Sequence, residues 1–129
     1  MTRVATGRTH QAKVMADTAS TGTGTYAAAN FLALSPTAAT TLDTDTSLVG
    51  EFTTGTLVRA QAVFTYSAGA SSYTLTKTFT SDQTVTLNRY GVFNVVTAAT
   101  GSPSFLGSIP SPPALVSGDQ AAVTETVSI

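Results

Sequence analysis

The chain has 129 residues and a mass of 13.1 kDa, the size of one domain with its own hydrophobic core. Only 10% of its residues are charged, against roughly 25% in typical soluble proteins, and the formal net charge is −1. This balance provides no basic field to attract nucleic acid or membrane phosphates. Cysteine is absent, which excludes disulfides and metal sites built on thiolates.

The sequence shows no pattern typical of a targeting signal. No apolar run reaches the ~20 residues that a membrane-spanning helix needs, and Met1–Arg8 lacks the apolar region of a signal peptide. We therefore expect neither a membrane partner nor export by an N-terminal signal. Threonine makes up about a fifth of the chain, and its β-branched side chain suits a strand better than a helix.

Residues 1–25 differ from the rest in composition. They carry half of the six basic residues, namely Arg3, Arg8 and Lys13. Residues 18–25 are rich in Thr and Gly, as expected of a connector. Two interpretations stay open for the part before it: a first strand at His10–Ala16 with a loose lead-in, or an arm that docks on a neighbouring subunit. We accordingly divide the chain into an arm or first strand plus linker (1–25) and a single β domain (26–129).

The clearest strand pattern lies between Leu57 and Thr80. In its first half one face carries Val58, Ala60, Ala62, Phe64 and Tyr66, and the other carries Arg59, Gln61, Val63 and Thr65. In its second half one face carries Tyr73, Leu75 and Phe79, and the other carries Thr74, Thr76, Thr78 and Thr80. This period of two, interrupted by the small residues 67–72, predicts a hairpin with one covered face. Its core is expected to contain Phe64, Tyr66, Leu75, Phe79, Val92 and Phe93.

Further strands are expected on both sides of this hairpin. A short apolar run at Asn30–Leu34 favours a strand over a helix, and Pro36–Gly50 is a loop. Later strands are expected at Thr84–Asn88, at Arg89–Val96 deep in a sheet, at an edge around Phe105–Leu106, and at Ala121–Ile129. The sequence therefore predicts an all-β protein of seven to eight strands, an antiparallel sandwich or jelly-roll-like fold with no long helix.

Catalytic and metal-binding patterns are weak. A catalytic triad would need the only histidine, His10, and the chain has no nucleophile elbow. Asp43 and Asp45 with Glu51 offer oxygen ligands for calcium, but Asp is equally favoured in turns, and the run lacks the fuller pattern of a calcium loop. We expect no enzymatic activity and no cofactor.

Two charges occupy faces that are otherwise apolar. Lys77 lies between Leu75 and Phe79, and Glu125 lies among Val123, Val127 and Ile129. A charge on a covered face is expected to be paired, to lie at the rim, or to contact another chain. Arg59 and Glu51 form a second possible pair. The candidate interface residues are therefore Arg3, Arg8, Lys13, Lys77 and Glu125.

Several short segments follow one another in a characteristic order. They are Asn30–Ser35 (NFLALS), Leu42–Glu51 (LDTDTSLVGE), Leu57–Arg59, Tyr90–Asn94 (YGVFN) and Gly118-Asp119 before a terminal Thr/Val strand. From Asn30 onward, the chain resembles a diffuse group of small structural proteins encoded by tailed bacteriophages. None of the shared residues carries catalysis, so the resemblance implies an architectural role within a virion that is assembled in the host cytoplasm.

The resemblance leaves the position within the particle open. Such proteins decorate or cement capsids, and the alternative is a tail, a tail fibre, or a receptor- or carbohydrate-binding module. A binding module would use rings from Tyr26, Tyr66, Tyr73 and Tyr90, although tyrosines on alternating strands more often pack in cores. The expected partners are further copies of the chain, as a homo-oligomer and plausibly a trimer, together with the major capsid or tail proteins.

Overall fold

The fold is all-β, as the computed structural model of the chain shows for residues 28–42, 44–101 and 103–129. The described residues contain no helix, and every strand pair is antiparallel. They form nine strands rather than the expected seven or eight. The strands are β1 (Phe31–Ser35), β2 (Ala60–Gln61), β3 (Val63–Thr65), β4 (Ser72–Thr80), β5 (Val85–Thr86), β6 (Arg89–Phe93), β7 (Pro103–Ser108), β8 (Ala114–Leu115) and β9 (Gln120–Ser128).

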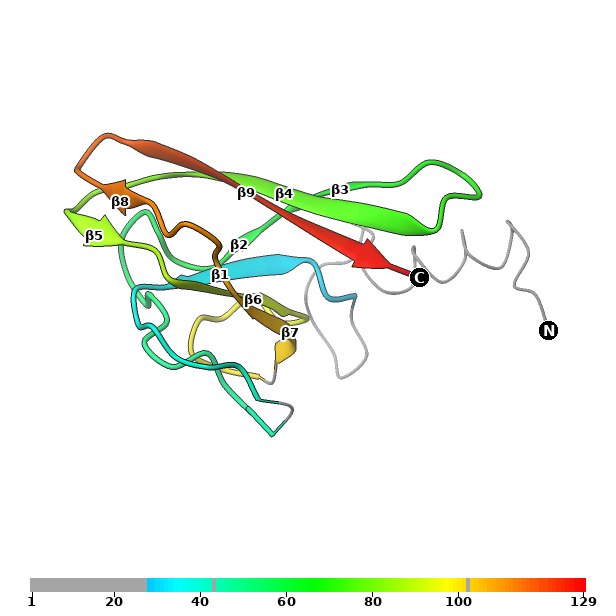
Figure 1. Ribbon diagram of the computed structural model, residues 1–129, viewed down its shortest axis with the longest axis horizontal. Helices are drawn as coiled ribbons and strands as arrows, with labels where there is room; N and C mark the ends of the chain where they lie inside the picture. Colours follow the sequence, from blue (N-terminus) through cyan, green and yellow to red (C-terminus); the bar gives the residue numbers. More distant parts are fainter. Residues whose placement is uncertain (1–27, 43, 102) are drawn as a thin grey trace.

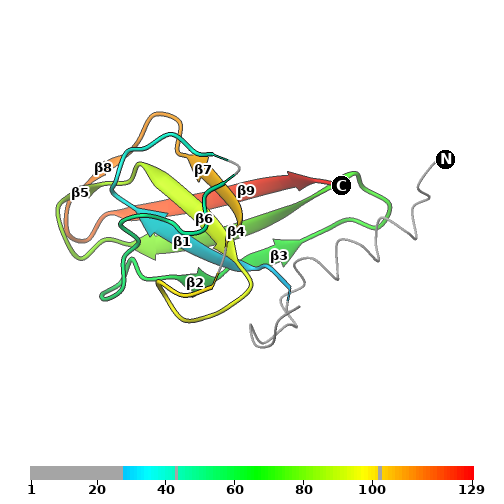
Figure 2. The same ribbon diagram turned by 90° about the horizontal axis from the view of Figure 1, so that it is seen from below.

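Two layers make up the sandwich (Figure 1). One layer has the strand order β2-β1-β6-β7 and the other has the order β3-β4-β9. The short pair β5-β8 lies at one end of the sandwich, and the C-terminus lies at the other (Figures 1 and 2). As expected, β6 is interior to its sheet and β7 lies at an edge.

The strand expected across residues 57–66 is split between the two layers. Its first part, β2, pairs with β1, whereas β3 pairs with β4. The chain crosses between them at Ala62, whose backbone N–H donates to the carbonyl of Asn30 at 2.8 Å. The predicted inner face is confirmed from Ala60 onward, but Arg59 was expected on the exposed face and is buried instead. Alternation fails at Arg59 because strand geometry begins only at the next residue.

The core between the layers is built on β4. Tyr73, Leu75 and Phe79 are 2% exposed or less, and they pack with Leu32 and Leu34 of β1. Of the six residues expected in the core, Leu75, Phe79, Val92 and Phe93 are buried. The other two, Phe64 and Tyr66, are half-buried and pack against the core from its rim. The face predicted for the hairpin is therefore correct.

The β1 layer is covered on both faces. On the side away from β4, Phe31 and Ala33 of β1 pack with Phe93 and with Leu48 from the loop before residue 50. This second cover explains why β1 is fully buried and why its sequence is apolar without alternation. Gly91 of β6 is part of this packing, because a Cβ there would lie 2.8 Å from the Phe93 ring.

Replacing Phe79 tests the inner face of β4. We expect Phe79→Ala to lower the free energy of unfolding by about 3–5 kcal/mol, because it leaves a cavity in the shared core. The matched control is Thr78→Ala, one residue away on the exposed face, with an expected change within about 0.5 kcal/mol. Urea denaturation measures both. A loss below about 1 kcal/mol for Phe79→Ala would show that this face does not carry the core.

Candidate functional site

Strand β9 is the longest edge strand among the described residues. Among the described residues, only β4 pairs with this nine-residue strand, so the N–H and C=O groups on its other side have no strand neighbour in that part of the chain. Edge strands are usually protected by Lys, Pro or a bulge. Strand β9 contains no Lys or Pro and its register with β4 is continuous from Gln120 to Ser128, so the inward-facing charge of Glu125 is its one protection of this kind. This edge is therefore open to pairing with another strand.

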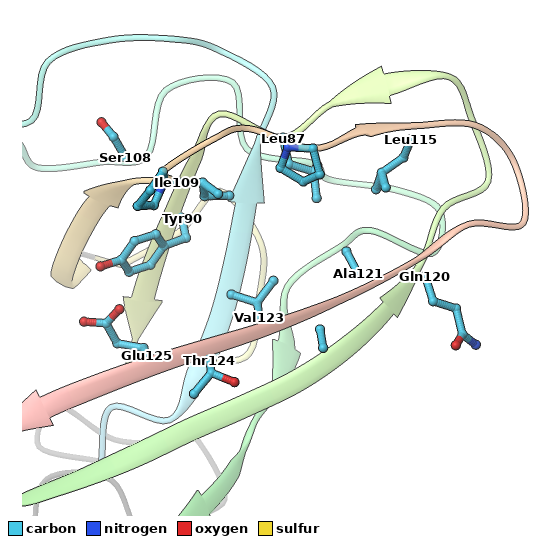
Figure 3. Close-up of a pocket in the computed structure, with 13 residues that line it drawn as sticks. Leu87, Tyr90, Ser108, Ile109, Leu115, Gln120, Ala121, Val123, Thr124 and Glu125 are labelled. Atoms are coloured by element: carbon cyan, nitrogen blue, oxygen red, sulfur yellow. The ribbon is translucent and has the colours of Figure 1, made fainter.

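A groove runs beneath this edge, between the two layers; we call it the β9 groove. Its larger part is a pocket of about 540 Å³ between the inner face of β9 and the segment from β6 to β8 (Figure 3). Apolar side chains dominate its lining, mainly Leu87, Ile109, Leu115, Ala121 and Val123. A second hollow of about 420 Å³ is lined by residues that include Asp45, Phe105 and Leu106. Both hollows share Tyr90 and Glu125.

Glu125 is the charged group of the β9 groove. The Tyr90 hydroxyl donates a hydrogen bond to its carboxylate, and the two side chains lie close together at one end of the pocket in Figure 3. Burial, followed by this hydrogen bond and the carboxylate charge, holds the pKa of Tyr90 above its ordinary value. Burial and then the charge of Glu125 raise the pKa of Tyr73 to about 12. Both tyrosines therefore stay neutral at physiological pH.

Lys77 lies on the same inner face as Glu125 but does not pair with it. Across β4 and β9, Lys77 is opposite Val123 and Glu125 is opposite Leu75, so the two charges are diagonal neighbours. Neither forms an ion pair with another described residue. Glu125 has a neutral tyrosine as its partner, which the sequence pattern did not predict. A role for Lys77 and Glu125 at an interface stays a prediction.

A different pair, Arg59 with Glu51, is formed as expected. The Arg59 guanidinium donates to both carboxylate oxygens of Glu51, at 2.9 and 2.7 Å, and the two side chains are 0% and 3% exposed. It also donates to the carbonyls of Val95 and Thr100, at 3.1 Å each, and lies 3.6 Å above the Phe93 ring. This Arg59 clamp fixes two loops on the outer side of the β1 layer, so its role is structural.

The proposed calcium ligands have other partners in the structure. Asp45 accepts a hydrogen bond from the N–H of Leu42, which closes a turn, and lies 3.5 Å from the guanidinium of Arg89. Glu51 is held by the Arg59 clamp. In the part of the chain that the structure describes, no cluster of three or more His, Cys, Asp or Glu is placed to hold a metal ion. Asp45 is therefore a turn residue beside a cation, which fits the alternative interpretation from the sequence.

Several residues that the sequence pattern singled out lie outside the described ranges. They are Arg3, Arg8, His10, Lys13, Tyr26 and Asp43. The described residues also contain no helix long and apolar enough to cross a bilayer. The β9 groove itself was missed by sequence reasoning, although the charge at Glu125 in an apolar strand was a signal for it.

Comparison with known proteins adds no relative. The chain matches no protein-family model, no curated protein sequence and no solved structure.

The two ion pairs provide a matched test of the clamp. We expect Glu51→Ala to lower the free energy of unfolding by about 3–5 kcal/mol, because it leaves the buried Arg59 guanidinium without a counter-charge. For Asp45→Ala the expected loss is about 1 kcal/mol or less, because that carboxylate is partly exposed and its ion pair is long. Thermal and urea unfolding measure both variants. Equal losses for the two would contradict a structural role specific to the clamp.

Proposed function

We propose that the chain is a non-enzymatic structural protein of a tailed-bacteriophage virion that assembles in many copies, as a capsid decoration or cement protein. The observation that carries the proposal is the open β9 edge above an apolar groove. Such an edge is a liability for a protein that works alone, because it invites pairing with any other strand. In a particle built from many copies, the same edge is covered by a defined neighbour.

The outer face of the β9 layer supports close packing between copies. Its side chains are small or polar and uncharged along the whole of β4 and β9. They are Ser72, Thr74, Thr76, Thr78 and Thr80 on β4, and Gln120, Ala122, Thr124, Thr126 and Ser128 on β9. With a net charge of −1, crowded copies repel one another only weakly. The resemblance of the segments from Asn30 onward to phage structural proteins points in the same direction.

A tail or tail-fibre position uses the same contact chemistry, so it is the second candidate. Binding of a receptor or carbohydrate has narrower support. Tyr66 and Tyr73 both pack against the Phe64 ring, with centroids 6.4 and 5.4 Å apart, so the Tyr73 ring belongs to the core and the Tyr66 ring packs at its rim. Only Tyr90, among the described tyrosines, lies in the groove where a ligand would reach it.

The composition of purified particles tests the proposed function. Quantitative mass spectrometry of virions from the phage that encodes the chain would give its copy number relative to the major capsid protein. A decoration protein is expected at a fixed ratio close to that of the capsid protein, whereas a tail part would be present in far fewer copies. Absence from particles that are otherwise complete would refute a virion role. Binding to a glycan array by protein absent from particles would favour the carbohydrate-binding alternative.

A further inference from the structure

The β9 edge and the β9 groove together have the form of an acceptor site for an added strand. Such sites combine an exposed sheet edge, which supplies main-chain hydrogen bonds, with pockets that take alternate side chains of the incoming strand. Here the edge is nine residues long. The groove side of β9 carries Ala121, Val123 and Glu125. An incoming strand would therefore meet apolar positions with one carboxylate among them.

That carboxylate specifies the charge of the incoming strand. Glu125 is half-buried, and its one hydrogen-bond partner among the described residues is the neutral hydroxyl of Tyr90. The other carboxylate at the groove, that of Asp45, lies 3.5 Å from the guanidinium of Arg89, and Lys77 is a diagonal neighbour of Glu125, but no described residue that lines either hollow is basic. A carboxylate in apolar surroundings is stabilised by a cation that shares its site. The complementary strand thus has a Lys or Arg flanked by an apolar side chain two positions away.

The chain contains such a segment before its first described residue. Residues 1–27 hold Arg3, Arg8 and Lys13, which are opposite in charge to Glu125. In an extended conformation, side chains two residues apart share a face, so Lys13 lies on the same face as Met15. If the segment pairs antiparallel to β9 with Lys13 opposite Glu125, Met15 falls opposite Val123. That position is in the apolar part of the groove.

Chain direction favours a donor from a second copy. Strand β9 ends near the end of the sandwich where β1 begins, so a strand antiparallel to β9 runs in the same sense as β1 (Figure 1). The last residue of the added strand would then lie at the end of the sandwich away from the start of β1. In the same chain, residues 17–27 would have to return along the sandwich; fully extended they span roughly 36–40 Å, which allows the return but requires a second extended segment to be ordered. A donor from a neighbouring copy has no such return path.

We propose that residues His10–Ala16 of one copy add as a strand to β9 of a second copy, with Lys13 facing Glu125 and Met15 entering the apolar groove. The inference rests on the proposed function in that it requires copies to lie side by side. Donor and acceptor are different surfaces, so each copy gives a strand to one neighbour and receives one from another. Contacts of this kind close into rings, and a trimer is the smallest ring beyond a reciprocal pair.

Charge reversal tests the Lys13–Glu125 contact in the full-length chain. Glu125→Lys and Lys13→Glu are each expected to weaken self-association about tenfold or more, because each leaves two like charges in the groove. The double variant restores association. The matched control combines Glu125→Lys with Arg8→Glu, which supplies the same net charge at the wrong position and fails to restore it. Rescue by both combinations would overturn the register, and so would no effect of either single variant on association.

Cysteine cross-linking tests the pairing without disturbing the groove. The chain has no cysteine, so each added thiol is unique. In the proposed register Ala12 lies opposite Thr126, both on the outer face. A mixture of Ala12→Cys and Thr126→Cys chains is expected to form a two-chain disulfide under mild oxidation. As the control, Thr74→Cys replaces Thr126→Cys; it lies at the same height on β4, one strand further from the edge, and is not expected to cross-link.

The outcomes separate this inference from the proposed function. A two-chain product supports strand donation between copies, whether or not the protein is found in virions. A chain carrying both cysteines that forms only an intrachain disulfide would overturn it, since the segment would then cover its own β9. If the protein is abundant in particles but forms no Ala12–Thr126 cross-link, the proposed structural function stands and strand donation between copies is refuted. Circular dichroism of each variant confirms that the β fold is retained.

Discussion

The burial of one face of β4 determines the arrangement of the rest of the sandwich. Tyr73, Leu75 and Phe79 point into the space between the layers, and β4 holds both β3 and β9 in register beside it. Because side chains alternate, the same geometry turns every Thr of β4 to the outside and places Lys77 on the inside. It also places Glu125 of β9 in the β9 groove. The core and the candidate assembly surface are thus two consequences of one register.

The stabilising contacts and the candidate assembly surface lie in different parts of the molecule. On the β1 layer, the Arg59 clamp and the Leu48 cluster close the outer side with charges that are fully paired and buried. At the β9 edge, Glu125 lies in an apolar groove with a neutral tyrosine as its partner among the described residues, and no described strand pairs with the outer side of β9. A fold optimised only for stability would remove both features. Their presence is consistent with an edge that is completed by another chain.

Local patterns predicted the fold where one face of a strand is covered. The alternation in β4 and β9 predicted the limits of both strands to within one residue, and it identified their inner faces. The uniform apolar run of β1 indicated a buried strand. The crossing at Ala62 was not predictable, because a strand that changes sheets keeps its alternation. The burial of Arg59 was likewise missed, because its hydrogen-bond partners are residues 51, 95 and 100, which lie apart in the sequence. The β9 groove depends on how far the layers separate, which is set by side chains distant in sequence.

The central claim is that the chain works as an assembled protein, and its state of association in solution tests this most directly. Sedimentation velocity of the full-length protein at micromolar concentration and physiological salt distinguishes the possibilities. We expect a discrete homo-oligomer, most simply three chains of 13.1 kDa each. A single species with the mass of one chain, unchanged as the protein concentration rises, would contradict it.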